Sequence, residues 1–576
     1  MIKKLSKLLD REQKLKSGIL FGMMVIASFL EMLSLGLIIP ILGLFLNSQN
    51  IPYINILNNF GIDDFSNEEL FTYFLLFFLL LYVLKISLLI FMSWYEQNFI
   101  AKFREEFSNK MFSKYITQNI SFFSGKNSSQ FLRNIMTEIE HLSIYMLSFF
   151  MATLEILTIS SLTIVLLYVD FSITLTTICL FIFVTFLYLK IIRPKVRQWG
   201  ITRHLSESKR IQFLQEGFGA VKDIKLLGRE KFFFDKFKFH NLNLRDVAAK
   251  IGFVNQLPRF VLELFIIITI ILIFIILNEK NNSFVDVLTV LALFLAAAFR
   301  IMPSLNRLIG SFQNMKFTSH AAEMLSKEMD LLTKENKNKK EKIKKITFTN
   351  NISVDIKNFK YNDSDKFMIK DINFSIKKGE KIGIIGPSGS GKSTFIEILL
   401  GILKPQNGQV NIDGNSIDAI SNLKEIVGYI PQKIFILDDS LRNNILFGLK
   451  NDDFKDEKII EIIKKTNLTG LLNRLKDGLN SRLGERGVDL SGGEIQRIGI
   501  ARALIYDPEI IFLDEATSSL DTFTERAILN ELKNFDNKTF ISVAHRVGTL
   551  KNCNKIYLIS QGKITDSGDF QKFINY

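Results

Sequence analysis

The residue pattern with the clearest chemistry is a glycine-rich stretch of nine residues that contains one lysine. It follows the apolar run Lys381–Ile385 and precedes a stretch with helical spacing, which is the strand–loop–helix context of a P-loop. Glycines let the backbone curl so that its N–H groups face phosphates, and the dipole of the following helix adds positive potential. Lys392 then reaches the β- and γ-phosphates, and Ser393 offers its hydroxyl to Mg²⁺. The pattern predicts a nucleotide site formed by Gly386, Pro387, Ser388, Gly389, Ser390, Gly391, Lys392, Ser393 and Thr394.

Two adjacent carboxylates end a second apolar run, Ile510–Leu513. A carboxylate at a strand end beside a P-loop can hold Mg²⁺ through its water shell, which assigns this role to Asp514. Glu515 is then placed to orient the attacking water or to take its proton. The alternative is that the pair merely charges a helix N-terminus. The four apolar residues before the pair and the P-loop upstream favour catalysis.

These motifs require a sheet and helices that position them. From about Ile352 onward, short apolar strands alternate with helical stretches, which is typical of an α/β fold with a mainly parallel sheet. We therefore predict an α/β nucleotide-binding domain over residues 351–576. Residues 334–350, which include the charge run Lys334–Lys345, are predicted to be a linker. A contact of this run with the membrane surface is the less favoured alternative.

The rest of the chain has a different composition. Its 576 residues are 48% hydrophobic and include 53 Phe, and the chain is too long for a single core, since cores rarely exceed ~250–300 residues. A helix needs ~20 mostly apolar residues to cross a bilayer. We predict an all-α membrane domain over residues 1–333 with six spans, near residues 19–46, 70–95, 142–168, 173–192, 254–277 and 284–309.

The distribution of Lys and Arg sets the orientation of these spans. The predicted outer loops carry a single one, Lys280, whereas residues 96–140 and 193–250 are rich in both. The N-terminus and the α/β domain therefore face the cytoplasm. The two basic segments have helical patterns and are interpreted as membrane helices prolonged into the cytoplasm, with turns near Asn119–Ser129 and Gly228–Lys236. Aromatic residues at these turns favour docking on another protein surface, with local packing as the alternative.

Charge and cysteine content exclude several other classes. The net charge of +14 fits positive cytoplasmic loops and an anionic membrane surface better than nucleic acid once spanning helices are present. Two cysteines, Cys179 and Cys553, provide neither a disulfide framework nor a zinc cluster. A cleaved signal peptide is disfavoured, because the first apolar run is too long and no A-x-A site ends it.

A third motif, Leu490-Ser-Gly-Gly-Glu494, stands between the P-loop and the carboxylate pair. P-loop, LSGG-type signature and Asp-Glu strand in this order resemble the ABC ATPase family. The last residue of the motif is Glu where family members more often carry Gln, a common change. The resemblance implies further contacts with ATP, which we assign to Tyr361 (stacking on adenine), Gln432 (sensing Mg²⁺), Asp521 (the D-loop) and His545 (bonding the γ-phosphate).

The same resemblance implies a mechanism. Two ATPase domains pack head to tail, so that Ser491, Gly492 and Gly493 contact the ATP held by the partner's P-loop. Lys392, Glu515 and His545 are then the catalytic residues of an ATP hydrolase that uses Mg²⁺, held by Ser393, Gln432 and, through water, Asp514. A chain with six spans and one ATPase domain must pair, and its intact motifs fit a homodimer. Membrane half first and ATPase second resembles the exporter type of ABC half-transporter, in which the two cytoplasmic turns are coupling helices.

Ionisable residues inside the predicted spans indicate a function, because inserting each of them into the membrane costs about 2.5–3.5 kcal/mol on insertion scales. Arginine matches the oxygens of a phosphate with its fork of donors. One interpretation is a cavity that accepts a phosphate or pyrophosphate head group. The other is internal pairing, which the i,i+4 spacing of Arg259 and Glu263 allows. The candidate cavity residues are Lys85, Arg259, Arg300 and Arg307.

Within the exporters the chain resembles the bacterial lipid-linked oligosaccharide flippases of protein N-glycosylation. The stretches that carry this resemblance are Leu257-Pro-Arg259, Arg300–Arg307 and the outer segment after the first span. It implies ATP-driven flipping of a polyprenyl-pyrophosphate-linked glycan across the bacterial inner membrane. An exporter of other lipids (lipid A-like), drugs or peptides remains the alternative, followed by a membrane ATPase without transport.

Overall fold

The computed structural model forms two compact units. The first comprises Met1–Gln118 and Gly125–Lys337, and the second comprises Asn119–Ser124 and Asn338–Tyr576. The structure describes residues 8–38, 41, 67–123, 125–279, 284–336, 344–361, 367–450, 453–484, 487, 490–515, 537–544 and 546–574. The segment 47–66 of the predicted outer loop, part of the predicted linker, Asp521 and His545 lie outside these residues.

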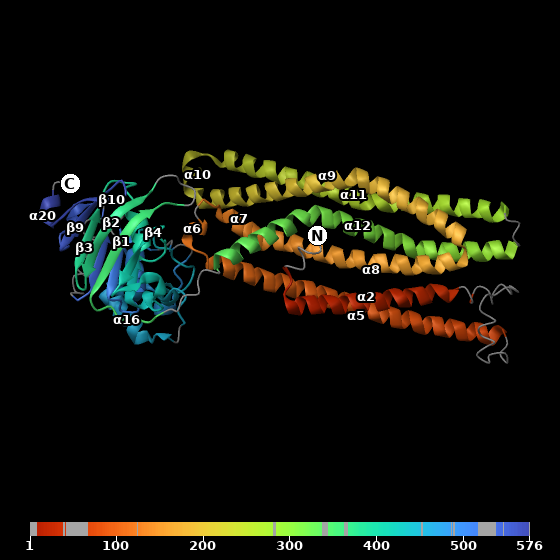
Figure 1. Cartoon of the computed structure of the whole chain (residues 1–576), viewed down its shortest axis with the longest axis horizontal. Coiled ribbons are helices and arrows are strands. Elements are labelled where there is room, and N and C mark those ends of the chain that lie inside the picture. The colour runs from red at the N-terminus through yellow and green to blue at the C-terminus, as the bar shows by residue number, and fades with distance from the viewer. Residues whose placement is uncertain are drawn as a thin grey trace. The chain divides into compact units, whose positions relative to one another are not determined.

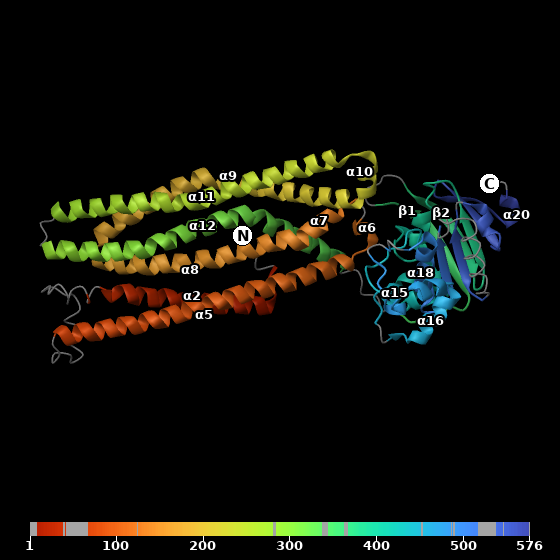
Figure 2. The same cartoon turned by 180° about the vertical axis from the view of Figure 1, so that it is seen from behind.

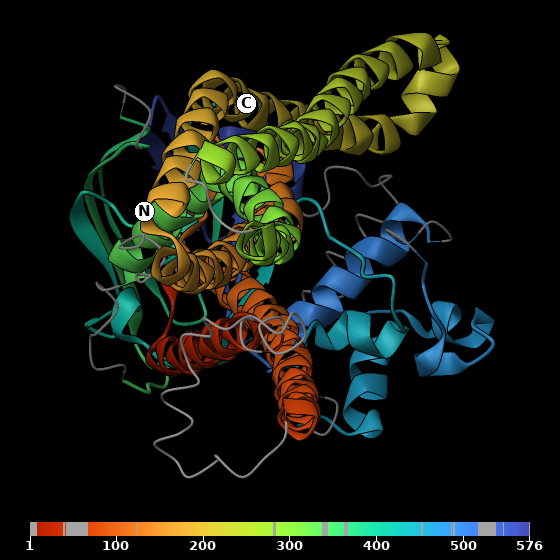
Figure 3. The ribbon, with the colours of Figure 1, turned by 90° about the vertical axis from the view of Figure 1, so that its right-hand side faces the viewer.

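The first unit is built from long helices that run side by side (Figures 1 and 2). Viewed end-on in Figure 3, α9 and α11 form a pair that extends away from α2 and α5. The helices are α2 (Arg11–Gly36), α5 (Asn67–Ile116), α7 (Ser128–Arg133), the π-helix η1 (Asn134–Glu138), α8 (Ile139–Val169), α9 (Phe171–Gly219), α10 (Val221–Leu227), α11 (Glu230–Glu279) and α12 (Phe284–Asn336).

Five helical stretches are long and apolar enough to cross a membrane within the described residues: 11–36, 69–116, 128–169, 171–219 and 230–272. Each of them overlaps one of the first five predicted spans. The sixth prediction, near 284–309, falls within α12, whose first side chains are not described. Few residues of the most apolar part of α5 are buried in the unit, as expected for side chains that face lipid.

The turns between the long helices largely follow the sequence. Asp170 alone separates α8 from α9, and its carboxylate accepts a hydrogen bond from the Ile173 amide at 2.9 Å, which caps α9. α5 ends at Ile116 and α7 begins at Ser128, so the predicted turn at 119–129 is also confirmed. The prediction of a turn over Gly228–Lys236 was partly wrong. The chain turns at Ala220 and at Gly228, where φ is +62°, and α11 already begins at Glu230.

The second unit contains two sheets, and its first segment carries the short helix α6 (Ile120–Phe123), in which Phe122 is buried. The antiparallel sheet has the order β2 (Ile369–Lys377), β1 (Asn351–Phe359), β4 (Asn407–Ile412) and β5 (Asn415–Ser416). The other sheet has the order β10 (Lys563–Gly568), β9 (Lys555–Ser560), β3 (Lys381–Ile385), β8 (Thr539–Val543), β7 (Ile510–Asp514) and β6 (Val427–Ile430). Its helices are α13 (Lys392–Leu399), α14 (Leu423–Ile426), α15 (Leu441–Leu446), α16 (Asp456–Lys465), α17 (Thr469–Arg474), α18 (Gly492–Leu504) and α20 (Phe570–Phe573).

The mainly parallel sheet that the sequence predicted is the six-stranded one, in which β9, β3, β8, β7 and β6 are parallel. The strands before the P-loop differ, because β1 and β2 pair antiparallel from Asn351–Lys377 to Phe359–Ile369. The segment that joins them is too short for a crossover connection, which takes a dozen residues or more. Isoleucine and phenylalanine from both sheets and from α13, among them Ile384, Phe395 and Phe512, form one core.

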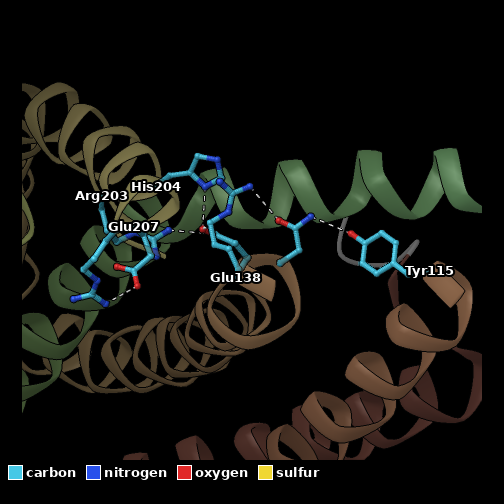
Figure 4. Close-up of polar contacts among 8 residues, drawn as sticks. Tyr115, Glu138, Arg203, His204 and Glu207 are labelled. Carbon is cyan, nitrogen blue, oxygen red and sulfur yellow. Dashed lines mark hydrogen bonds and ion pairs between the residues drawn. The ribbon is translucent and has the colours of Figure 1, made fainter. Parts of the chain in front are cut away.

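A buried charge cluster joins α8 to α9 in the first unit. Glu138, the last residue of the π-helix η1, is 0% exposed. Its carboxylate lies 2.9 Å from Nδ1 of His204 and accepts a hydrogen bond from Nη2 of Arg203 at 3.3 Å. Figure 4 shows both side chains converging on Glu138. Because a buried charge must be compensated, this cluster fixes how the cytoplasmic extension of α9 packs on the start of α8.

Replacing Glu138 by Gln should lower the unfolding temperature of the purified protein in detergent by several degrees. The buried Arg203 would lose its counter-charge, and breaking a buried pair costs about 3–5 kcal/mol. Glu140→Gln is the matched control, because the side chain of Glu140 is half exposed two residues further along the chain. Equal unfolding temperatures for the two variants would contradict a stabilising role for the cluster.

Candidate nucleotide-binding site

The P-loop lies between β3 and α13, as the sequence predicted. Gly391 is the N-cap of α13 with φ of +102°, and a Cβ atom there would come within 2.9 Å of the carbonyl oxygen of Met368. Gly389 adopts φ of +77°. Both positions favour glycine for its backbone freedom. The loop thus keeps the tight curvature that a phosphate cradle requires.

Lys392 lies over the loop rather than in solvent. Its ammonium group donates to the carbonyl oxygens of Gly386 at 2.9 Å and Pro387 at 3.1 Å. Burial lowers the pKa of Lys392, while the carboxylates of Glu515 and Asp514 act in the opposite direction. The ammonium group of Lys392 therefore lies over the loop. When a nucleotide binds, its phosphate oxygens would replace the loop carbonyls as partners of this group.

The carboxylate pair stands at the end of β7. Asp514 and Glu515 are both more than nine-tenths buried. Glu515 adopts φ of +49°, an uncommon conformation for a residue other than glycine. Nε2 of Gln432 donates to Oε2 of Glu515 at 2.6 Å. The structure therefore brings together three residues that lie far apart in the sequence: the P-loop lysine, the predicted catalytic carboxylate and the predicted glutamine sensor.

The structure adds a residue that the sequence reasoning did not single out. Tyr429 stands in β6 opposite Phe512 of β7, and its hydroxyl donates to Oδ2 of Asp514 at 3.3 Å. Phe512 and Asp514 are two residues apart on β7, so their side chains point to the same face of the sheet. Because Tyr429 lies opposite Phe512, its ring is on that face as well. The signal was present in the sequence, because Tyr429 precedes Gln432 by three residues in an apolar strand.

The predicted adenine-stacking residue lies near the P-loop helix. The hydroxyl of Tyr361 lies 3.0 Å from Oγ1 of Thr394, and its ring packs edge-on against Phe359. Its hydroxyl is thus anchored to α13 next to the loop. This arrangement fits a platform for a base whose phosphates lie in the loop.

The signature motif caps α18. Ser491 is the N-cap residue, and its backbone N–H donates to Oε2 of Glu494 at 2.8 Å, while the Glu494 amide donates back to Oγ of Ser491 at 3.3 Å. This capping box explains why Glu is well suited to the position where related motifs carry Gln. In the part of the chain that the structure describes, no hydrogen bond joins Ser491, Gly492 or Gly493 to the P-loop residues.

The geometry is compatible with ATP and Mg²⁺. Oγ of Ser390 is buried in the P-loop without a hydrogen-bond partner among the described residues, which is a site that a phosphate oxygen would satisfy. Ser393, Gln432 and Asp514 offer oxygen atoms, the ligands that Mg²⁺ prefers. The bound metal would neutralise charge that develops on the phosphates. Glu515 would orient the attacking water.

The four predicted cavity cations lie in the first unit, and each faces a carboxylate. Lys85 lies 3.4 Å from Glu31, which also accepts from Nη2 of Arg300 at 2.7 Å. The remaining two pairs are Arg307 with Glu155 and Arg259 with Glu263. Arg300 and Arg307 line one cavity together with both of their carboxylate partners, whereas Arg259 is largely exposed on α11.

Two family models match the chain. Residues 18–302 match the ABC transporter transmembrane region, and residues 369–518 match the ABC transporter model. Among solved structures, a bacterial Atm1-family ABC exporter with ATP bound is similar with a TM-score of 0.74 over 96% of both chains at 20% identity. This likeness establishes the fold: a helical transmembrane domain followed by an α/β nucleotide-binding domain.

Curated proteins are similar to this chain over aligned segments of different length. The heterocyst differentiation ATP-binding protein HepA of Nostoc sp. is 25% identical over 83% of this chain and 78% of its own length. The mitochondrial iron-sulfur clusters transporter ATM1 of Kluyveromyces lactis is 39% identical over 35% of this chain and 29% of its own. An export ATP-binding/permease protein of Rickettsia typhi is 39% identical over 38% of both chains. The aligned part thus spans well under half of the latter two proteins.

Replacing Glu515 by Gln should reduce ATP hydrolysis by at least ~100-fold, because general-base assistance is worth about 10²–10⁴-fold. Binding of a fluorescent ATP analogue should persist, since the amide keeps the shape of the side chain. Phosphate release and nucleotide titration measure the two quantities. Glu461→Gln on the exposed face of α16 is the control; hydrolysis by E515Q at the rate of this control would refute the catalytic assignment.

Replacing Tyr429 by Phe should raise the Mg²⁺ concentration needed for half-maximal hydrolysis severalfold, with the rate recovering at saturating Mg²⁺. The change removes one hydrogen bond from the carboxylate of Asp514, and hydrogen bonds to charged groups contribute about 1.5–3 kcal/mol. A Mg²⁺ titration at fixed ATP gives the value, with Tyr506→Phe in the same domain as control. An unchanged Mg²⁺ requirement would exclude a positioning role for Tyr429.

Proposed function

Because the chain belongs to the ABC transporter family, we propose that two copies of it form an ATP-driven exporter in the bacterial inner membrane. The observation that carries the proposal is an ATP site that is half assembled. Lys392, Gln432 and Glu515 converge in one chain, while no hydrogen bond between described residues joins the signature at Ser491 to the P-loop of that chain. A second copy packed head to tail would supply the signature to each site.

The proposed mechanism links ATP to the helices of the membrane domain. Bound ATP would lie between the P-loop of one subunit and Ser491–Gly493 of the other, so that binding closes the two ATPase domains. Glu515 would then orient water toward the γ-phosphate, with Gln432 holding its carboxylate at 2.6 Å in the structure. Hydrolysis would remove the bridging phosphate and reopen the pair. Such closure and opening can drive alternating access of a membrane cavity.

Exposed apolar side chains around α10 support pairing of two copies. Phe218 at the end of α9 is 77% exposed, and Leu226 and Leu227 in α10 are 85% and 66% exposed. They lie where the chain turns between α9 and α11, within the segment 193–250 that is predicted to face the cytoplasm. This turn lies outside the predicted spans, so that lipid does not cover these side chains. Contiguous exposed apolar surface commonly marks a protein contact. We assign it to docking on the ATPase domain of the partner copy.

For the transported molecule we propose a lipid-linked anion, with a polyprenyl-pyrophosphate-linked glycan as the first candidate. Arg300 and Arg307 lie seven residues apart on α12 and line one cavity of about 300 Å³. Both guanidinium groups already contact carboxylates, yet each keeps further N–H donors, since a guanidinium group has five. A pyrophosphate would therefore bind beside Glu31 and Glu155 or displace them.

Exporters of other cargo are the second candidate. The pairing of all four predicted cations with carboxylates is the observation that favours this candidate, because it removes the need for an anionic ligand. The relative from Kluyveromyces lactis is named for iron-sulfur clusters, but the alignment with it spans 35% of this chain and carries little weight for the cargo.

Purified protein in liposomes with a fluorescent polyprenyl-pyrophosphate glycan should expose the glycan to an external probe when ATP is added. Glu515→Gln should abolish the signal. Arg300→Lys, which keeps the charge opposite Glu31 but loses the planar fork of donors, should slow flipping several-fold. ATP hydrolysis without glycan exposure would remove the glycolipid assignment and leave the exporter proposal in place.

A further inference from the structure

The cavity that contains Arg300 and Arg307 holds another charged residue with a different environment. The cavity has a volume of about 300 Å³ and lies within the first unit, between α2, α5, α8 and α12. Glu96 of α5 lines it near the cytoplasmic end of the second predicted span. The apolar lining includes Met24, Met92, Met151 and Phe150.

Glu96 is buried and has no counter-charge among the described residues. Its exposed fraction is 6%, and its Oε1 accepts no hydrogen bond from any described residue. No ion pair of Glu96 occurs within the part of the chain that the structure describes. By contrast, Glu31 faces Arg300 and Lys85, and Glu155 faces Arg307. The two arginines that line the cavity, and Lys85 beside Glu31, are thus already engaged by the other two carboxylates.

An unpaired carboxylate in such a place is unfavourable for the protein alone. Burying an ionised carboxyl group without a partner costs far more than burying a paired one. Ionisable residues in membrane-spanning regions mark substrate or ion pathways for the same reason. The missing partner is therefore expected to come from a molecule that enters the cavity.

We propose that Glu96 binds the positively charged group of an amphiphilic organic cation that occupies this cavity. One carboxylate balances one monovalent cation. Three methionines provide an adaptable apolar lining, and the ring of Phe150 can face a cation with its π-system. A metal ion fits less well, because no group of three or more His, Cys, Asp or Glu side chains that could hold one occurs among the described residues. The inference concerns the same cavity as the anionic cargo proposed above, but it rests on Glu96 and not on the arginines.

The test compares two probes of the same shape and opposite charge, tetraphenylphosphonium and tetraphenylborate. Binding of each to the full-length protein in detergent, without ATP, is measured by equilibrium dialysis with empty micelles subtracted. Tetraphenylphosphonium should bind in preference to tetraphenylborate. Glu96→Gln should weaken its binding by about tenfold or more, since losing a charge-assisted contact commonly costs this much. Glu96→Asp, which keeps the charge, should bind more tightly than Glu96→Gln.

Glu105→Gln is the matched control, because Glu105 is an exposed residue of the same helix; its affinity should equal that of the unmodified protein. Thermal unfolding and gel filtration identify any variant that fails to fold, and Glu96→Asp then carries the comparison. The proposal is overturned if the unmodified protein binds neither probe, if it binds both equally, or if Glu96→Gln binds tetraphenylphosphonium within twofold of the control. None of these outcomes depends on ATP hydrolysis or flipping.

Discussion

Charges that leave water must find a counter-charge, and much of this structure follows from that requirement. Glu138 joins α8 to α9 because Arg203 and His204 meet it in the interior. In the membrane domain Glu31 and Glu155 hold three cations, which ties α12 to α2 and α8, and α5 to α2. Each such contact favours one packing of two helices. Shifting either helix would separate the ion pair and leave a buried charge without its counter-charge.

The nucleotide site obeys the same constraint with a different outcome. Lys392 donates hydrogen bonds to two carbonyl groups of the loop, and Glu515 accepts one from the side-chain amide of Gln432. These partners are neutral, so phosphate and Mg²⁺ can replace them with a gain in charge balance. The Tyr429 hydroxyl donates a hydrogen bond to Asp514 and helps to position its carboxylate.

The fold is that of an ABC exporter, and the family models cover both halves of the chain. The α/β domain matches the ABC transporter model, and the helical half contains several helices that are long and apolar enough to cross a membrane. Identity of cargo is a separate matter, because it depends on a few side chains in a cavity rather than on the fold. Among the described residues, the cavity combines arginines that contact carboxylates with Glu96, which has no ion pair, and that combination distinguishes it from a site that binds only anions.

The sequence alone determined those elements that a short stretch of neighbouring residues identifies. Apolar runs of spanning length, the P-loop between Lys381–Ile385 and α13, and the carboxylates after Ile510–Leu513 all lie within a few residues of the signal that identifies them. Tertiary structure decided what depends on residues far apart in the chain. The antiparallel pairing of β1 and β2, the contact of Tyr429 with Asp514, and the partners of Arg300 and Arg307 belong to this class. Sequence spacing suggested an anion site for the arginines, whereas Glu31 and Glu155 reach them through helix packing, which no local pattern encodes.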